Sequence, residues 1–162
     1  RVLSMVGRNF DGKIPQPREL DEPAKELFVE AQKRFDETEK NLAECHFRAA
    51  LQSAMFLAQA ANRYLDTKAP WKAVKEDIDD AATTLWVGMT VINCLKTMFD
   101  PFIPFSAEKL HKLLGLEGTV QDEGWGWSQD ALKPGIELPK PKPLFIKLDE
   151  SIIEEETARL GK

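Results

Sequence analysis

The chain has 162 residues, 43% of them hydrophobic and 30% charged, which is the composition of one ordinary globular domain. Its formal net charge of -5 argues against a non-specific nucleic-acid coat protein, because such a protein neutralises phosphates with an excess of basic residues. No apolar run approaches the roughly 20 residues that a membrane-spanning helix needs. The sequence starts at Arg1 without a methionine and already has a helical pattern there, which predicts a piece of a longer protein.

Two long helices are predicted in the first half of the chain. The segment from Pro23 to about Glu39 repeats apolar residues at the i, i+3, i+4, i+7 spacing of a helix with one apolar face. Pro23 suits a first helical turn, where its missing N–H costs nothing. The segment from about Asn41 to Leu65 is apolar on nearly all sides, which predicts a helix buried among others.

A corner is predicted after the second of these helices. Asp66 and Thr67 have side chains that can cap the helix that follows. Ala69 precedes Pro70 and is expected to be extended, because the residue before a proline avoids the α region. Trp71 then opens the next helical segment.

A second buried helix is predicted from about Asp80 to Phe99, where two prolines at positions 101 and 104 interrupt the pattern. Ser106 is expected to be the N-cap of a short helix from Ala107 to Leu114. Gly115 suits the end of that helix, because glycine adopts the left-handed backbone that commonly closes a helix.

The sequence changes character after Gly115. Residues 116–143 have no sustained period and contain glycines, prolines and the run Gly-Trp-Gly-Trp at 124–127. We expect an extended arm that docks through apolar side chains, namely Trp125, Trp127, Leu144, Phe145 and Ile146. The acid-rich end from Asp149 onward is expected to be solvated, as a helix or a frayed end.

These patterns predict an all-α fold: an antiparallel bundle of four to five helices in residues 1–115, with an extended C-terminal arm in residues 116–162. Such a bundle suits an adaptor, a scaffold or an RNA-binding module equally well. Cys45 and Cys94 lie in apolar helical patterns and are expected to be buried, reduced thiols. With His46 and His111 as the two histidines, the spacing supports no metal site, and no catalytic grouping or glycine-rich phosphate loop is present.

Trp71 has two interpretations. The local pattern favours a core side chain, because tryptophan is highly buried on average. A tryptophan held at a helix–helix corner by a neighbouring proline also suits an exposed platform, and stacking of a splayed base on an aromatic ring is how many proteins recognise single-stranded RNA loops.

A family resemblance bears on this choice. The run formed by Asn62, Tyr64, Asp66, Pro70 and Trp71 resembles the N-x-Y-x-D-x-x-x-P-W signature of methionyl-tRNA synthetases. Three further blocks resemble the same family in the same order, so that the resemblance covers residues 1–149: RVLSMVGRNFDGKIP at 1–15, FDPFIPFSAEKLHKLLG at 99–115 and PKPLFIKLD at 141–149.

The resemblance implies the helical anticodon-binding domain of a class I aminoacyl-tRNA synthetase, which recognises the CAU anticodon. It implies that Trp71 stacks on the first anticodon base, with Pro70 beside it and Asp66 in the same loop. Ser4 and Arg8 match an asparagine and an arginine of the family that contact anticodon bases, although Ser4 offers a hydroxyl where the family has an amide. Arg8 keeps the planar donor group that suits a base edge or a phosphate.

The resemblance also implies what the chain lacks. The family's catalytic signatures HIGH and KMSKS are absent from these residues, so we expect no cofactor here and no activity from the domain alone. The parent enzyme would join methionine to its tRNA in the cytoplasm, with ATP and Mg bound by a catalytic domain outside this chain. The expected partners are the anticodon loop of methionine tRNA and, through the arm, the enzyme's own N-terminal catalytic domain.

The alternative is a helical docking bundle with no RNA role. In that interpretation Trp71, Trp125 and Trp127 anchor a protein partner, and the run PKPKP is a polyproline ligand. The first helix argues against it, because the i, i+4 spacing of Ser4 and Arg8 places both on one polar face.

Overall fold

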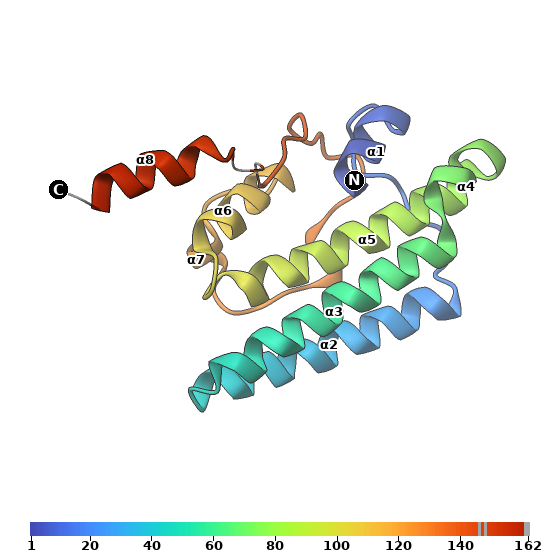
Figure 1. The fold of residues 1–162 in the computed structure, drawn as a ribbon. Coiled ribbons are helices and arrows are strands. Elements are labelled where there is room, and N and C mark those ends of the chain that lie inside the picture. The colour runs from blue at the N-terminus through green and yellow to red at the C-terminus, as the bar shows by residue number, and fades with distance from the viewer. Residues whose placement is uncertain (146, 148, 161–162) are drawn as a thin grey trace.

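The computed structural model describes residues 1–145, 147 and 149–160 and shows the predicted all-α fold (Figure 1). The helices are α1 (Val2–Asn9), α2 (Glu22–Ala43), α3 (Phe47–Lys68), α4 (Pro70–Glu76), α5 (Ile78–Phe99), α6 (Pro104–Leu113), α7 (Val120–Glu123) and α8 (Ser151–Leu160), with a short 3-10 turn at Gln129–Ala131. Six of them lie within residues 1–115, one more than the upper bound of the prediction, since the short α1 and α4 are separate elements. No helix in the described part of the chain is long and apolar enough to cross a bilayer.

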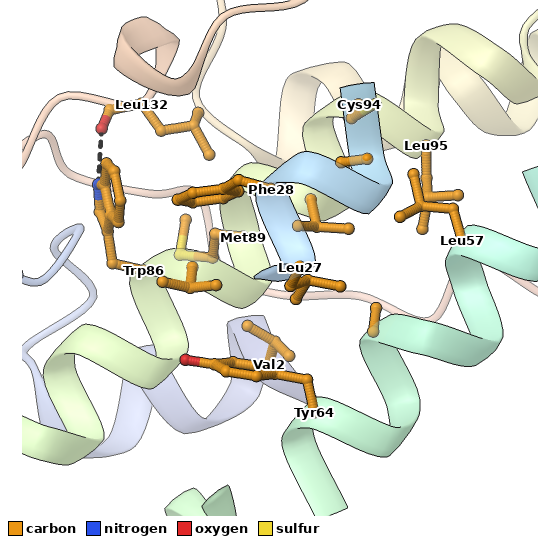
Figure 2. Packing of buried hydrophobic residues seen from close by; sticks show 14 of the residues in the cluster. Val2, Leu27, Phe28, Leu57, Tyr64, Trp86, Met89, Cys94, Leu95 and Leu132 are labelled. Atoms are coloured by element: carbon orange, nitrogen blue, oxygen red, sulfur yellow. Dashed lines mark hydrogen bonds between the residues drawn. The ribbon is translucent and has the colours of Figure 1, made fainter. Parts of the chain in front are cut away.

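The long helices α2, α3 and α5 form the body of the bundle, and each runs antiparallel to the long helix before it (Figure 1). Every residue from Ala81 to Val91 of α5 is buried, and a helix that is apolar on all sides takes the central position. Figure 2 shows side chains of α2 and α3 meeting those of α5, among them Phe28, Leu57 and Met89.

The α2–α3 connection differs from the prediction. A helix was expected to begin at about Asn41, but α2 continues to Ala43 and α3 begins at Phe47. The chain reverses at Cys45, whose backbone is left-handed with φ 59°. No glycine or proline marks this turn in the sequence, so the helical pattern runs through it without an apparent break.

The two cysteines differ in accessibility. Cys94 is buried as predicted, but Cys45 lies in the α2–α3 turn and is exposed, so the prediction of two buried thiols was wrong for Cys45. We expect a maleimide to label Cys45 rapidly, and Cys94 only when the protein unfolds, because burial raises the pKa of the Cys94 thiol well above its usual range. Mass spectrometry after timed labelling measures both, and rapid double labelling of the folded protein would contradict this packing.

The start of α6 also differs from the prediction. Ser106 lies within the first turn instead of capping it, and the helix begins at Pro104 with Ile103 as the N-cap residue. Proline is favoured at a first helical position because its φ is fixed near the helical value. Gly115 has φ 73° directly after the end of α6, as predicted.

The first part of the arm packs on the bundle. Trp125 stacks on Phe35 of α2, with ring centroids 5.0 Å apart, and Trp127 lies 6.5 Å from Phe28. The carbonyl of Leu132 accepts a hydrogen bond of 3.1 Å from Nε1 of the buried Trp86 (Figure 2). The tryptophans therefore dock the arm as predicted.

The later part of the arm has fewer such contacts. Leu144 is half-buried, Phe145 is 67% exposed and so does not dock as expected, and Ile146 lies outside the described residues. The acidic end forms α8, which projects away from the bundle (Figure 1).

Candidate nucleic-acid interface

The α3–α4 corner determines where Trp71 lies. α3 continues through Asp66 and Thr67 to Lys68. The prediction that these two side chains cap the next helix is therefore wrong, because the N-cap residue of α4 is Ala69. Ala69 has φ 42° and ψ 57°, which is left-handed instead of extended. Its N–H donates to the Leu65 carbonyl at 2.9 Å, and its carbonyl accepts from Lys72 at 2.8 Å. Ala69 thus ends α3 and begins α4. The prediction of an extended Ala69, which was based on the preference of residues before proline, is wrong.

Pro70 and Trp71 occupy the first turn of α4. Pro70 is buried, and as the first helical residue it loses no hydrogen bond through its missing N–H. Trp71 is 38% exposed, whereas Trp86 is 8% exposed in the core. The core interpretation of Trp71, which the local sequence favoured, is therefore wrong, and its ring is accessible to a ligand.

Trp71 borders a groove of about 570 Å³ between α1, α3, α4 and α5. The polar and aromatic side chains that line this groove are those of Arg1, Asn62, Asp66 and Trp71. Met5 and Pro70 also line it. Asp66 and Asn62 are exposed at its edge. The groove thus brings together Trp71, Pro70 and Asp66, three of the five residues predicted to contact the anticodon.

Arg1 is the residue of this groove that the sequence interpretation missed. Its guanidinium carbon lies 5.2 Å from the centroid of the Trp71 ring, a cation–π distance. Arg1 precedes Ser4 by three residues and Arg8 follows Ser4 by four, and both spacings place residues on one side of a helix. That spacing was a usable signal, but the partner of Arg1 lies 70 residues away in sequence, where only the fold brings it near.

Gly88 of α5 helps to place Arg1. A Cβ at Gly88 would lie 3.4 Å from Leu65 Cδ2 and 3.7 Å from Val2 Cγ2. These are ordinary van der Waals distances, so α5 packs directly against α3 and α1 beneath the groove at this position. The start of α1, and with it Arg1, is held beside the α3–α4 corner.

Ser4 and Arg8 do not line this groove. Ser4 is half-buried and borders a second, mainly apolar cavity of about 750 Å³ between α1, α5, α6 and the arm. Arg8 is exposed in the last turn of α1 and borders neither cavity. The roles that the resemblance implies for these two residues stay predictions.

Several basic residues lie near Trp71 although the chain is acidic overall, but Lys68 is paired with Asp21 and Asp80, and Asp66 lies in the groove itself. The segment 67–75 contains Lys68, Lys72 and Lys75 and no acidic residue. Arg1 adds a fourth cation at the ring. The exposed Lys72 and Lys75 close to an accessible aromatic ring suit a nucleic acid that is recognised at one place, because they offer phosphate contacts beside a stacking surface.

Other chemistry finds little support in the described residues. Within residues 1–145, 147 and 149–160, no group of three or more His, Cys, Asp or Glu side chains could hold a metal ion. The docking interpretation loses two of its three anchors, because Trp125 and Trp127 pack on Phe35 and Phe28 of the same chain.

Comparison with known proteins decides the family. Residues 14–162 match the sequence profile of the anticodon binding domain of methionyl tRNA ligase. The chain belongs to this family. Methionine–tRNA ligase of Roseiflexus sp. (strain RS-1) is 40% identical over 184 aligned positions, which cover 99% of this chain and 31% of the relative. That of Dehalococcoides mccartyi (strain ATCC BAA-2266 / KCTC 15142 / 195) is 46% identical over 161 positions, covering 99% of this chain and 29% of the relative.

Solved structures of the family have the same fold. Methionyl-tRNA synthetase of Mycobacterium tuberculosis in its apo form superposes with a TM-score of 0.80 at 28% identity, over 92% of this chain and 30% of that one. The same enzyme in complex with methionyl-adenylate also gives a TM-score of 0.80, over 90% of this chain. The chain thus spans about a third of the length of the family members that it matches.

Proposed function

We propose that this domain recognises the CAU anticodon of methionine tRNA by stacking a base of the anticodon loop on Trp71. The observation that carries the proposal is the accessible ring of Trp71, fixed at a helix corner at the edge of a groove and accompanied by Arg1. Pro70 holds the corner from within, and Asp66 provides an acceptor at the groove edge.

Arginines in and next to α1 would donate hydrogen bonds to the anticodon loop. Arg1 is favoured by the geometry, because its guanidinium already faces the ring and its planar group can pair with a base edge or a phosphate. Arg8 and Ser4 belong to the proposal on the strength of the sequence resemblance, as contacts further along α1.

The activity of the whole enzyme belongs to the same proposal. As part of a methionine–tRNA ligase, the domain would deliver tRNA to a catalytic domain that joins it to methionine in the cytoplasm. ATP, with Mg, would bind to that domain and not to these residues, and the domain alone would be inactive. The arm after Leu138 would face the catalytic domain, which agrees with the exposure of Phe145 and the projection of α8 from the bundle.

Two RNA stem-loops that differ only in a CAU or GAU loop test the proposal directly. We expect tryptophan fluorescence to report tighter binding of the CAU loop, because base contacts supply specificity. With few phosphate contacts, log K against log salt should have a slope shallower than about -5. Equal affinity for both loops, or a steeper slope, would show that the domain senses charge and shape instead of the anticodon.

A further inference from the structure

Lys68 joins three helix ends directly beside the proposed platform. It is the last residue of α3, one position before the left-handed Ala69 and three before Trp71. Its Nζ lies 3.0 Å from Oδ2 of Asp21 and 2.8 Å from Oδ1 of Asp80. Asp21 is the N-cap residue of α2, and Asp80 lies in the first turn of α5. One ammonium group therefore ties the end of α3 to the starts of α2 and α5.

The contacts are partly shielded from water. The Lys68 side chain is 18% exposed, so salt and water screen these ion pairs less than they would at an open surface. Burial opposes the charge on Lys68, but hydrogen bonds with Asp80 and Asp21 outweigh it and raise the pKa of the amine. Burial also opposes the charge on Asp21, but the hydrogen bonds from Lys68 and from the Ala24 amide lower its pKa. Lys68 and Asp21 are therefore both charged at neutral pH.

The corner depends on such an external tie because its backbone is unfavourable. Alanine rarely adopts the left-handed conformation seen at Ala69, so the surrounding structure must hold it there. α4 has only seven residues, too few to be stable by itself. Without the ammonium group, Asp21 and Asp80 would also face each other as unpaired like charges.

We propose that Lys68 is the positioning residue of the anticodon platform: its ion pairs with Asp21 and Asp80 fix the α3–α4 corner and thereby the orientation of the Trp71 ring. This inference rests on the proposed function of Trp71 as a stacking surface. Lys68 itself need not touch RNA. The neighbouring lysine Lys72 is exposed and offers a matched control, since Lys72→Met removes the same charge from the same corner.

The first readout needs no RNA. In the 162-residue chain labelled with 5-fluorotryptophan, each of the four tryptophans gives a fluorine resonance, and Trp71→Phe identifies that of Trp71. In Lys68→Met we expect the Trp71 resonance to shift or broaden while those of Trp125 and Trp127 stay in place. Lys72→Met should leave the Trp71 line near its original position, and Lys68→Arg should restore it. An unchanged Trp71 resonance in Lys68→Met would overturn the proposal.

The second readout is the ratio of CAU to GAU affinity. Lys68→Met should lower this ratio by about fivefold or more, because a base that Trp71 no longer orients loses its edge contact with Arg1, and about fivefold is the lower end of the discrimination that one bidentate base contact supplies. Lys72→Met should weaken both RNAs alike and preserve the ratio. A shifted resonance with an unchanged ratio would overturn the link between Lys68 and recognition. If the original chain has no CAU preference, the proposed function fails, while the fluorine spectrum still decides whether Lys68 positions Trp71.

A folding control keeps the test decisive. If circular dichroism shows that Lys68→Met does not fold, Asp80→Asn replaces it, because it removes one ion pair and leaves the α2 cap intact. The expected Trp71 shift is then smaller but in the same direction. A folded Asp80→Asn chain with an unaltered Trp71 resonance would contradict the proposal equally.

Discussion

Trp71→Ala is expected to weaken binding of the CAU stem-loop by about 5- to 150-fold, which corresponds to the about 1–3 kcal/mol that stacking of one base contributes. The fold should change little, because the ring is 38% exposed and contributes less to the core than a buried tryptophan. Titration by fluorescence anisotropy of labelled RNA measures the affinity, and thermal melting followed by circular dichroism measures the stability.

The matched control for this substitution is Phe105→Ala. Phe105 lies in α6 and is 83% exposed, so the change removes an exposed aromatic side chain that does not border the Trp71 groove. We expect it to leave RNA affinity unchanged. Loss of RNA binding in both variants, or unfolding of Trp71→Ala, would show that the ring of Trp71 is not a specific stacking surface.

Glu123→Ala is expected to be among the most destabilising single changes, lowering the free energy of unfolding by about 2–3 kcal/mol. Glu123 pairs with Nζ of Lys96, whose side chain is fully buried, so its loss leaves a buried cation without a carboxylate. Breaking a fully buried pair costs about 3–5 kcal/mol, and we expect less here because Glu123 is 32% exposed. The pair joins the central α5 to the arm, and chemical denaturation measures the effect.

His111 is the second side chain that contacts Lys96, and this contact sets the loss of stability expected when Lys96 is replaced. Its Nε2 lies 2.9 Å from the carbonyl of Glu117, which only accepts, so Nε2 carries the proton and Nδ1 accepts from Lys96 at 3.2 Å. Lys96→Met removes the buried cation, so no unpaired buried charge is left. Glu123 is 32% exposed and can be hydrated by solvent. We expect it to cost about 1 kcal/mol, for the lost hydrogen bond to His111.

The difference between the two variants is the decisive result. Glu26→Ala, an exposed glutamate on α2, should have almost no effect and controls for the loss of an acidic residue. If Lys96→Met were as destabilising as Glu123→Ala, the unpaired buried charge would not be the cause, and the lost contact between Lys96 and Glu123 would account for both effects instead.

Part of the site could be predicted from the sequence. The run from Asn62 to Trp71 pointed to the correct family, and Trp71, Pro70 and Asp66 do share one groove. The local pattern alone favoured a core position for Trp71, since tryptophan is highly buried on average, whereas the resemblance implied an accessible ring. Its exposure results from the left-handed turn at Ala69, a residue whose type and proline neighbour indicate a different conformation.

The sequence by itself determined the helical class, because the period of apolar residues distinguishes a helix from a strand. It predicted burial on nearly all sides for both the 41–65 and the 80–99 segment, which is correct for α5 but wrong for α3, where Phe47, Leu51, Met55 and Phe56 are exposed. It also predicted that tryptophans dock the arm, and the structure identifies α2 of the bundle as the surface that they contact. Only the tertiary structure decided that Arg1 lies over Trp71, that Lys68 ties three helix ends, and that Lys96 meets Glu123. Each of these pairs joins residues in or next to different helices that are 12 to 70 positions apart. Helical periodicity describes neighbours along one helix, whereas these contacts arise from how the helices pack.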